Sequence, residues 1–181
     1  MRPGSSALAA LWGFAEATLF FIVPDVLLTG LALRSVRKAL AAAMIAAVSA
    51  TLGGALVRIC AETFPGTTRA VLLLVPGVSQ ATFAEVRRLL DTGLFEGMVA
   101  GAFTGVPYKI FAAEAGFSGT GPWIFALVSP LARLPRFAVM CLVAWGLSKW
   151  IGGRLPDRSK LAIALGLWAV FYVFYFNTVG W

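Results

Sequence analysis

The chain has 181 residues, of which 60% are hydrophobic and only 13% are charged, and its mean hydropathy is +0.87. A typical soluble domain is about 45–50% apolar and about 25% charged, so these values argue against a soluble enzyme, a disulfide-rich secreted scaffold and a disordered chain. We therefore expect an all-α polytopic membrane protein built as a single membrane domain, with room for about four to six helical or half-helical elements.

Charge, cysteine and histidine content narrow the class further. The 15 lysines and arginines outnumber the 8 acids, but they cluster between apolar runs, so we expect contact with anionic lipid head groups and no nucleic-acid partner. Cys60 and Cys141 lie inside apolar runs and are expected to be reduced thiols. The sequence has no histidine, which removes Ser-His-Asp catalysis and His-ligated zinc. We predict no metal, no catalytic residue and no cofactor beyond a coupling proton or Na⁺.

The first apolar run spans residues 7–33 and contains both charges and a break. It carries Glu16 and the pair Pro24-Asp25. Proline interrupts the helical hydrogen-bond ladder, and irregular backbone at membrane depth survives only where protein or a cavity surrounds it. We therefore predict a re-entrant helical hairpin over 7–33. A signal peptide ending near Ala17 is the alternative, but the apolar run continues well past that point.

A basic edge and an uninterrupted span follow this hairpin. Arg34, Arg37 and Lys38 mark a cytoplasmic edge of the membrane. Residues 39–61 form an alanine-rich apolar run, which predicts a transmembrane helix whose small residues let neighbouring helices approach closely. Residues 62–96 are of mixed polarity and are predicted to lie outside the membrane.

The segment 82–92 is the amphipathic part of this extramembrane region. Phe83 and Val86 fall on one face of a helix, and the charged residues lie elsewhere. The pattern predicts either an amphipathic helix lying at the membrane interface or a solvated helix in a loop. Ser79 or Thr82 is expected to cap it.

The apolar run 97–117 repeats the organisation of the first one. It has a central break at Gly105 and Pro107, and it carries Lys109 and Glu114. Interrupted apolar segments in two halves of a membrane protein indicate an inverted repeat with a site between the halves. We therefore predict a second re-entrant hairpin over 97–117, oriented oppositely to the first. Glu114 is expected either to pair with Lys109 or to face the outer surface.

The remainder of the chain is predicted to cross the membrane twice. We expect, in order, a helix at 122–133, a transmembrane helix at 136–151, a basic loop at 152–160 and a transmembrane helix at 161–179. Placing both basic edges in the cytoplasm gives about three transmembrane helices in total and a cytoplasmic N-terminus.

Charges inside the apolar runs are the candidate site. Each costs on the order of 2.5–3.5 kcal/mol to insert, which indicates either a functional role or mutual neutralisation; the residues are Glu16, Asp25, Lys109, Arg133 and Arg136. Pro24 and Pro107 begin the outgoing half-helices, whose N-termini carry partial positive charge and favour a phosphate. The two carboxylates oppose an anion unless they are protonated, paired with bases or bound to a coupling cation, so a proton-coupled cycle is the hypothesis.

Three stretches of the chain carry a resemblance to a known family. The run AEATLFFIVPDVLL, with Glu16, Pro24 and Asp25, resembles the first re-entrant loop of the DedA family, also called the SNARE-associated Golgi protein or VTT-domain family. GAFTGVPYKIFAAEAG is similar to its second re-entrant loop, and PLARLPRF is similar to the basic stretch in its short, YqaA-like members. The resemblance covers roughly residues 10–151.

This resemblance implies lipid translocation. Bacterial members move undecaprenyl phosphate across the inner membrane, and eukaryotic relatives scramble phospholipids. The family's acidic pair corresponds to Glu16 and Asp25. Many members have two arginines in the second loop, whereas this sequence has only Lys109 there, so Arg133 and Arg136 are candidates for the missing positive charge.

We therefore expect a flippase for an anionic lipid phosphate, either a polyprenyl phosphate or a phospholipid, in a bacterial inner membrane, and we expect it not to be an enzyme. A non-transporting assembly subunit is the alternative. An intramembrane lipid hydrolase is a third reading, disfavoured because the sequence has neither histidine nor a Gly-x-Gly-Asp motif. A chain this short makes a thin wall around any cavity, which favours a homodimer.

Overall fold

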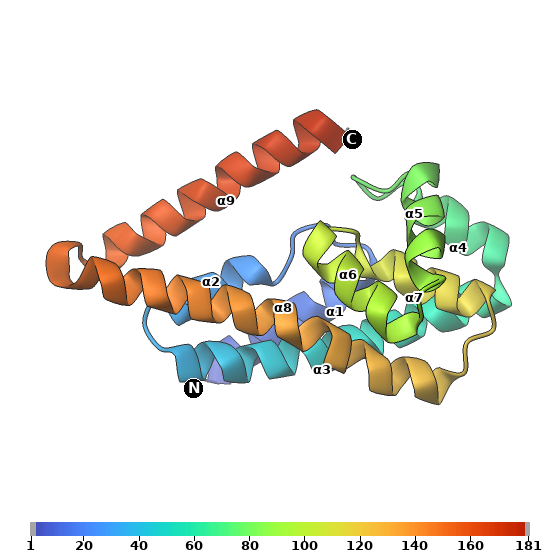
Figure 1. Ribbon diagram of the computed structural model, residues 1–181, viewed down its shortest axis with the longest axis horizontal. Helices are drawn as coiled ribbons and strands as arrows, with labels where there is room; N and C mark the ends of the chain where they lie inside the picture. The colour runs from blue at the N-terminus through green and yellow to red at the C-terminus, as the bar shows by residue number, and fades with distance from the viewer. Residues whose placement is uncertain (1–2, 180–181) are drawn as a thin grey trace.

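The protein is described by a computed structural model covering residues 3–179, with side chains described for 5–177. Every regular element in this range is a helix (Figure 1). The helices are α1 (Pro3–Thr18), α2 (Asp25–Ala32), α3 (Val36–Thr63), α4 (Pro65–Leu72), α5 (Gln80–Leu90), α6 (Leu94–Thr104), α7 (Tyr108–Phe117), α8 (Pro122–Ile151), a 3-10 turn η1 (Gly152–Arg154) and α9 (Asp157–Val179).

Three of these helices are long and apolar enough to cross a membrane. They are α3, α8 continued through η1, and α9, for which the qualifying ranges are Val36–Thr63, Pro122–Arg154 and Asp157–Asn177. In Figure 1, α3 and α8 run side by side in opposite directions, and α9 turns back from the end of α8. The expectation of an all-α membrane protein with about three spans is confirmed at this level.

Both interrupted apolar runs form a helix, a break and a second helix. The first is α1, the segment 19–24 and α2, which begins directly after Pro24. The second is α6, the segment 105–107 and α7. Gly105 ends α6 with a φ of 84°, a left-handed value that favours glycine, and Pro107 precedes α7 in an extended conformation. Each unit is followed by a long helix. In Figure 1 the two breaks lie near each other at the middle of the molecule.

The region predicted as a helix at 122–133 and a separate span at 136–151 is instead the single helix α8. Both Pro130 and Pro135 lie inside it. Proline removes one backbone hydrogen bond, but a membrane helix tolerates this loss when neighbouring helices hold both sides of the break. Here Ser129 contacts α3 before the first proline, and Arg136 bonds α2 after the second, so the helix continues through both.

The segment 62–96 contains the short helices α4 and α5. The Ser79 hydroxyl accepts from the backbone N–H of Thr82, and the Thr82 hydroxyl accepts from the backbone N–H of Ser79, forming a capping box at the start of α5. Phe83 and Val86 are buried on its inner face, which confirms that the helix is amphipathic. On its outer face Arg88 donates to Glu85, and this hydrogen bond lowers the pKa of the Glu85 carboxyl below its usual value.

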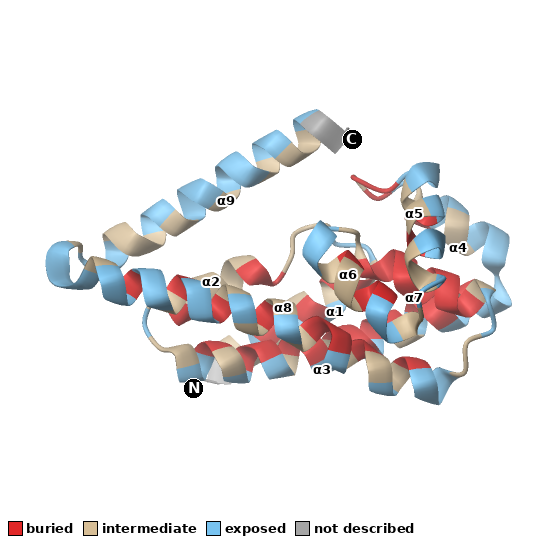
Figure 2. Cartoon of the chain, in the orientation of Figure 1, coloured by how far each residue is buried: buried red, intermediate tan, exposed pale blue. Residues whose placement is uncertain are grey.

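Small residues let the helices of the interior pack closely. Figure 2 shows the buried residues concentrated in α3, α7 and the adjoining faces of α2 and α8. Much of α3 presents alanine and glycine to α1, which allows the two backbones to approach. By contrast, none of the α9 residues from 157 to 177 is buried, so α9 is an outlying helix of the molecule.

Close packing of α1 on α3 leads to a stability prediction. At Gly13 an added methyl group would meet the backbone carbonyl of Ala46 at less than a packing distance. We expect Gly13→Ala to destabilise the protein by about 1–3 kcal/mol, because backbone must move to make room. Gly166→Ala in α9 is the matched control, since nothing lies within 4 Å of its added methyl group. Thermal unfolding in detergent measures both; equal melting temperatures for the two variants would contradict the packing account.

Candidate functional site

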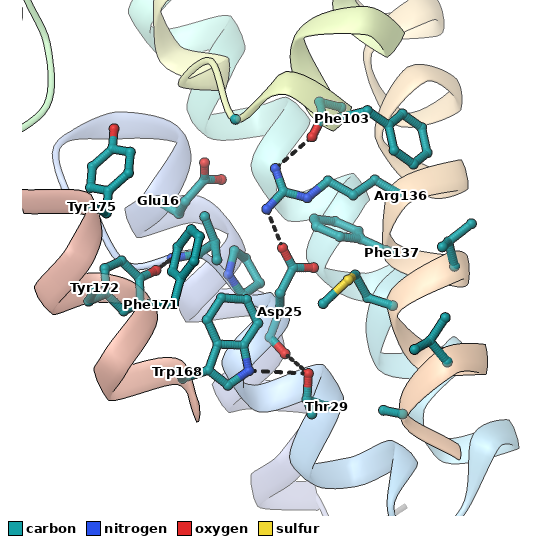
Figure 3. Close-up of a pocket in the computed structure, with 18 of the residues that line it drawn as sticks. Glu16, Asp25, Thr29, Phe103, Arg136, Phe137, Trp168, Phe171, Tyr172 and Tyr175 are labelled. Atoms are coloured by element: carbon teal, nitrogen blue, oxygen red, sulfur yellow. Dashed lines mark hydrogen bonds and ion pairs between the residues drawn. The ribbon is translucent and has the colours of Figure 1, made fainter. Parts of the chain in front are cut away.

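A cavity of about 830 Å³ lies between the two breaks, α8 and α9. The five charged residues of the predicted site all line it, as do the three residues predicted to mark the breaks: Glu16, Pro24, Asp25, Gly105, Pro107, Lys109, Arg133 and Arg136. Most other lining side chains are apolar. Figure 3 shows Asp25 between Arg136 and Phe137 of α8 on one side and the aromatic side chains of α9 on the other.

Arg136 and Asp25 form the ion pair at the wall of this cavity. One guanidinium nitrogen of Arg136 donates to Asp25 Oδ2 at 2.6 Å, and a second donates to the carbonyl oxygen of Ala102 in α6 at 2.8 Å. Asp25 is fully buried, while a quarter of the Arg136 side chain is exposed. The other carboxylate oxygen, Oδ1, has no hydrogen-bond partner among the residues the structure describes. The pair thus links α2, α6 and α8.

Arg133 and Glu16 form a second, more enclosed pair. Arg133 donates to Glu16 Oε2 at 2.6 Å, and less than a tenth of either side chain is exposed. The guanidinium carbon lies 4.2 Å from the ring centre of Tyr108 and 5.1 Å from that of Phe137, and such contacts stabilise a desolvated cation. Because it is enclosed and joins α1 to α8, we assign this pair a structural role in the wall of the cavity.

Lys109 supplies the unmatched charge of the cluster. It lies in the first turn of α7, is 2% exposed, and its Nζ donates to the backbone carbonyl of Phe20 at 2.7 Å. Since Phe20 belongs to the break between α1 and α2, this hydrogen bond ties the two breaks together. In this cluster the carboxylates of Glu16 and Asp25 face three bases, and Lys109 is the one of these bases whose hydrogen bond goes to an uncharged group.

Glu114 was expected either to pair with Lys109 or to face the outer surface, but it is buried, does not line the cavity and pairs with another base. Its carboxylate lies 3.6 Å from the guanidinium of Arg87 in α5. It is five residues after Lys109 in α7 and lines a separate pocket of about 420 Å³, together with Glu62 and Arg69. We therefore assign Glu114 to the packing of α5 against α7.

The aromatic wall supplied by α9 was not anticipated from the sequence. Tyr172 accepts a hydrogen bond from the backbone N–H of Val23 at 2.8 Å, and Trp168 donates to the Thr29 hydroxyl at 3.4 Å. Trp168, Phe171, Tyr172 and Tyr175 follow helical spacing and all line the cavity. The sequence signal for this wall is the helical spacing of these four aromatic residues, which places them on one face of α9.

A buried hydroxyl network beside Arg133 was also missed. The Tyr108 hydroxyl is hydrogen-bonded to Ser129 of α8, and Ser129 in turn lies 3.2 Å from the Thr51 hydroxyl of α3. All three residues are buried, and buried polar groups that partner one another hold helices in one arrangement. The network therefore fixes the ring on which Arg133 rests.

The chemistry of this cavity suits an anion better than a metal. The N-terminus of α7 and Lys109 both present positive charge to it, and Arg136 is partly exposed there. The positive end of α2 is already matched by Asp25 at its first position. Within the described range, no three His, Cys, Asp or Glu side chains come close enough to hold a metal ion.

The chain is similar over most of its length to a known protein. An uncharacterized protein of Haemophilus influenzae is 29% identical to this chain over 176 residues, which cover 94% of this chain and 88% of that protein. No family model matches the chain. No solved structure matches it.

Proposed function

We propose that this protein moves an anionic lipid phosphate across a membrane. The observation that carries the proposal is the cavity itself: apolar walls surround a cluster in which three bases face two carboxylates. Water-soluble substrates do not require such walls, whereas a lipid phosphate needs apolar surface for its chain and positive charge for its head. The resemblance of both interrupted segments to DedA loops supports the same substrate class.

The arrangement of the two breaks supports an inverted repeat in the membrane. In each half a short helix, a break, a second short helix and a long helix follow one another, and Lys109 joins the two breaks. Transporters of this kind place their sites where broken helices meet near the bilayer midplane. In the proposed mechanism the two helix–break–helix units are re-entrant hairpins that enter from opposite faces.

Charge distribution supports a cytoplasmic N-terminus in a bacterial inner membrane. The two basic edges lie at the same end of the molecule, because Arg34 is 3.7 Å from Asp157 and the Ser148 hydroxyl donates to the carbonyl of Leu33. The opposite end, around α4 and α5, mixes acids and bases. Under the positive-inside rule, the end that holds both basic edges faces the cytoplasm.

The ion pairs suggest how carboxylates couple to transport. While Asp25 is ionised, it occupies the guanidinium of Arg136 and competes with an incoming phosphate. Protonation of Asp25 would weaken this hold and leave Arg136 available to the phosphate, and deprotonation would favour release. A proton is therefore the proposed coupling ion, with Na⁺ as the alternative.

The proposal is tested by reconstituting the purified protein into vesicles that contain a fluorescent polyprenyl phosphate and measuring its movement between leaflets. We expect faster movement than in protein-free vesicles, with the lipid chemically unchanged, and a rate that depends on an imposed proton gradient. Release of inorganic phosphate would indicate the hydrolase instead. If the protein neither moves nor hydrolyses the lipid, the proposal is overturned in favour of an assembly subunit. Cross-linking in the same vesicles tests the expected homodimer.

A further inference from the structure

The cavity extends away from the charged cluster as an apolar groove between α8 and α9. On α8 its wall begins at Arg136 and ends at Ile151, and on α9 it runs between Lys160 and Tyr175. Fifteen residues of helix correspond to about 22 Å on either wall. We call this the α8–α9 groove; the apolar side chains along its middle include Val139, Val143, Leu147, Ile163 and Leu167.

Each wall of the groove is one stripe of a helix. The lining positions recur every three or four residues along both α8 and α9, which is the period of a single helical face. The side chains along the middle of both stripes are apolar. Two polar groups also line the groove, but the Ser148 hydroxyl donates to the Leu33 carbonyl and the Trp168 indole N–H donates to the Thr29 hydroxyl. The middle of the groove therefore offers little to a head group, whereas a hydrocarbon chain needs no polar partner.

Both ends of the groove carry bases, but they differ in the hydrogen-bond donors that these bases offer an anion. At its inner end Arg136 and Lys109 meet in the cavity, where bases outnumber acids. At its outer end the Lys160 ammonium donates to the backbone carbonyl of Ser148 at 3.1 Å and so closes the groove beside η1. The Lys160 ammonium already donates twice to Ser148, whereas Arg136 and Lys109 together carry more N–H donors at the inner end. The inner end therefore takes the anionic head, and the chain lies along the groove.

We propose that the α8–α9 groove is the chain-binding subsite for a lipid phosphate with a single long hydrocarbon chain. The phosphate contacts Arg136 and Lys109, and the chain lies between α8 and α9 toward Ile151. This assignment rests on the proposed function for the nature of the head group. It adds that α9 selects the substrate by its chain, and that a groove formed by one stripe from each of two helices takes one chain.

The test uses hexadecyl phosphate with a photoactivatable diazirine at the far end of its chain, in phosphatidylcholine vesicles containing the full-length protein. Irradiation followed by peptide mass spectrometry locates the labelled residues. We expect labelling of α8 and α9 near Leu147 and Ile163, and strong competition by unlabelled polyprenyl phosphate. Lys109→Met, which strands no carboxylate, should lower this labelling about tenfold or more, the effect of losing a hydrogen bond to a charged group.

Two neighbouring positions on α8 provide a matched pair of variants. Val143 lines the groove, whereas Leu142 is exposed and lies outside its lining. We expect Val143→Trp to fill the groove and lower labelling about tenfold, and Leu142→Trp to leave it unchanged. If Val143→Trp fails to fold, Leu167→Trp and its control Leu165→Trp make the same comparison on α9, since only Leu167 lines the groove.

The outcomes separate this inference from the proposed function. Equal labelling of the same positions by a hexadecanol probe would overturn the subsite, because the groove would then take any chain. Equal losses in the Val143 and Leu142 variants would also overturn it, because the labelling would then not depend on the groove. Lipid movement that continues without groove labelling overturns the subsite and leaves the proposed function standing. Phosphate-dependent groove labelling without lipid movement supports the subsite and contradicts transport.

Discussion

Replacing Arg133 with methionine should lower the melting temperature of the protein by roughly 10 °C. The substitution leaves the Glu16 carboxylate in an enclosed site without its partner, since less than a tenth of either side chain is exposed. Breaking a buried ion pair by removing one partner typically costs about 3–5 kcal/mol, which corresponds to a shift of this size in a chain of this length. Thermal unfolding in detergent, followed by circular dichroism, measures the effect.

Two further variants identify the source of this loss. Glu16→Gln combined with Arg133→Met removes both charges, and we expect it to recover much of the stability because no unpaired charge remains buried. Arg34→Met removes the same type of side chain from a pair that is about 60% exposed, so it should change stability by less than about 1 kcal/mol. A double variant as unstable as Arg133→Met would show that the packing of the guanidinium on Tyr108 and Phe137, and not charge pairing, dominates.

Replacing Lys109 with methionine should strongly reduce lipid transport while leaving the protein folded. Methionine keeps the length and apolar contacts of the side chain but removes the charge that makes the cluster net positive. The lost hydrogen bond goes to a backbone carbonyl, so no carboxylate is stranded, and we expect a stability loss of about 1–3 kcal/mol. Transport of the fluorescent lipid phosphate should fall by about tenfold or more, which corresponds to the loss of one charged contact to phosphate.

Lys149→Met is the control for this second prediction. Lys149 is exposed near the end of α8, so it changes the net charge of the protein equally without altering the cavity. Asp25→Asn provides an independent arm: it keeps the shape of the side chain but prevents the change of charge that the coupling hypothesis requires. Full transport in both the Lys109 and the Asp25 variants would contradict the proposed role of the cluster.

The two arginines of the cluster have different surroundings. Arg133 rests on aromatic rings and is enclosed with Glu16, so its main effect is on stability. Arg136 is partly exposed to the cavity, and its partner Asp25 has an oxygen without a hydrogen bond among the described residues. A pair with an exposed cation and an under-bonded acid is the better one to exchange partners with a phosphate. Arg133 thus holds the site and Arg136 is available to the substrate.

Local composition was enough to predict the class of protein and the position of its breaks. Long apolar runs predict membrane helices because backbone hydrogen bonds must be satisfied inside the helix in lipid. Pro24, Gly105 and Pro107 mark the interruptions because their own backbone preferences act locally. Charged residues within apolar runs stand out because inserting each one is costly. None of these inferences requires knowing which helices are neighbours.

Tertiary structure decided the pairing of charges, the continuity of α8 and the role of α9. Glu16 bonds Arg133 across 117 residues of sequence, and Asp25 bonds Arg136 across 111, so the partners depend on how α1 and α2 pack against α8. The same contacts hold the helix through Pro135, where local preference alone predicts a break. The aromatic face of α9 becomes the wall of a cavity only because the chain turns back at η1. Local sequence determines which groups are costly to bury, and helix packing determines what each of them meets.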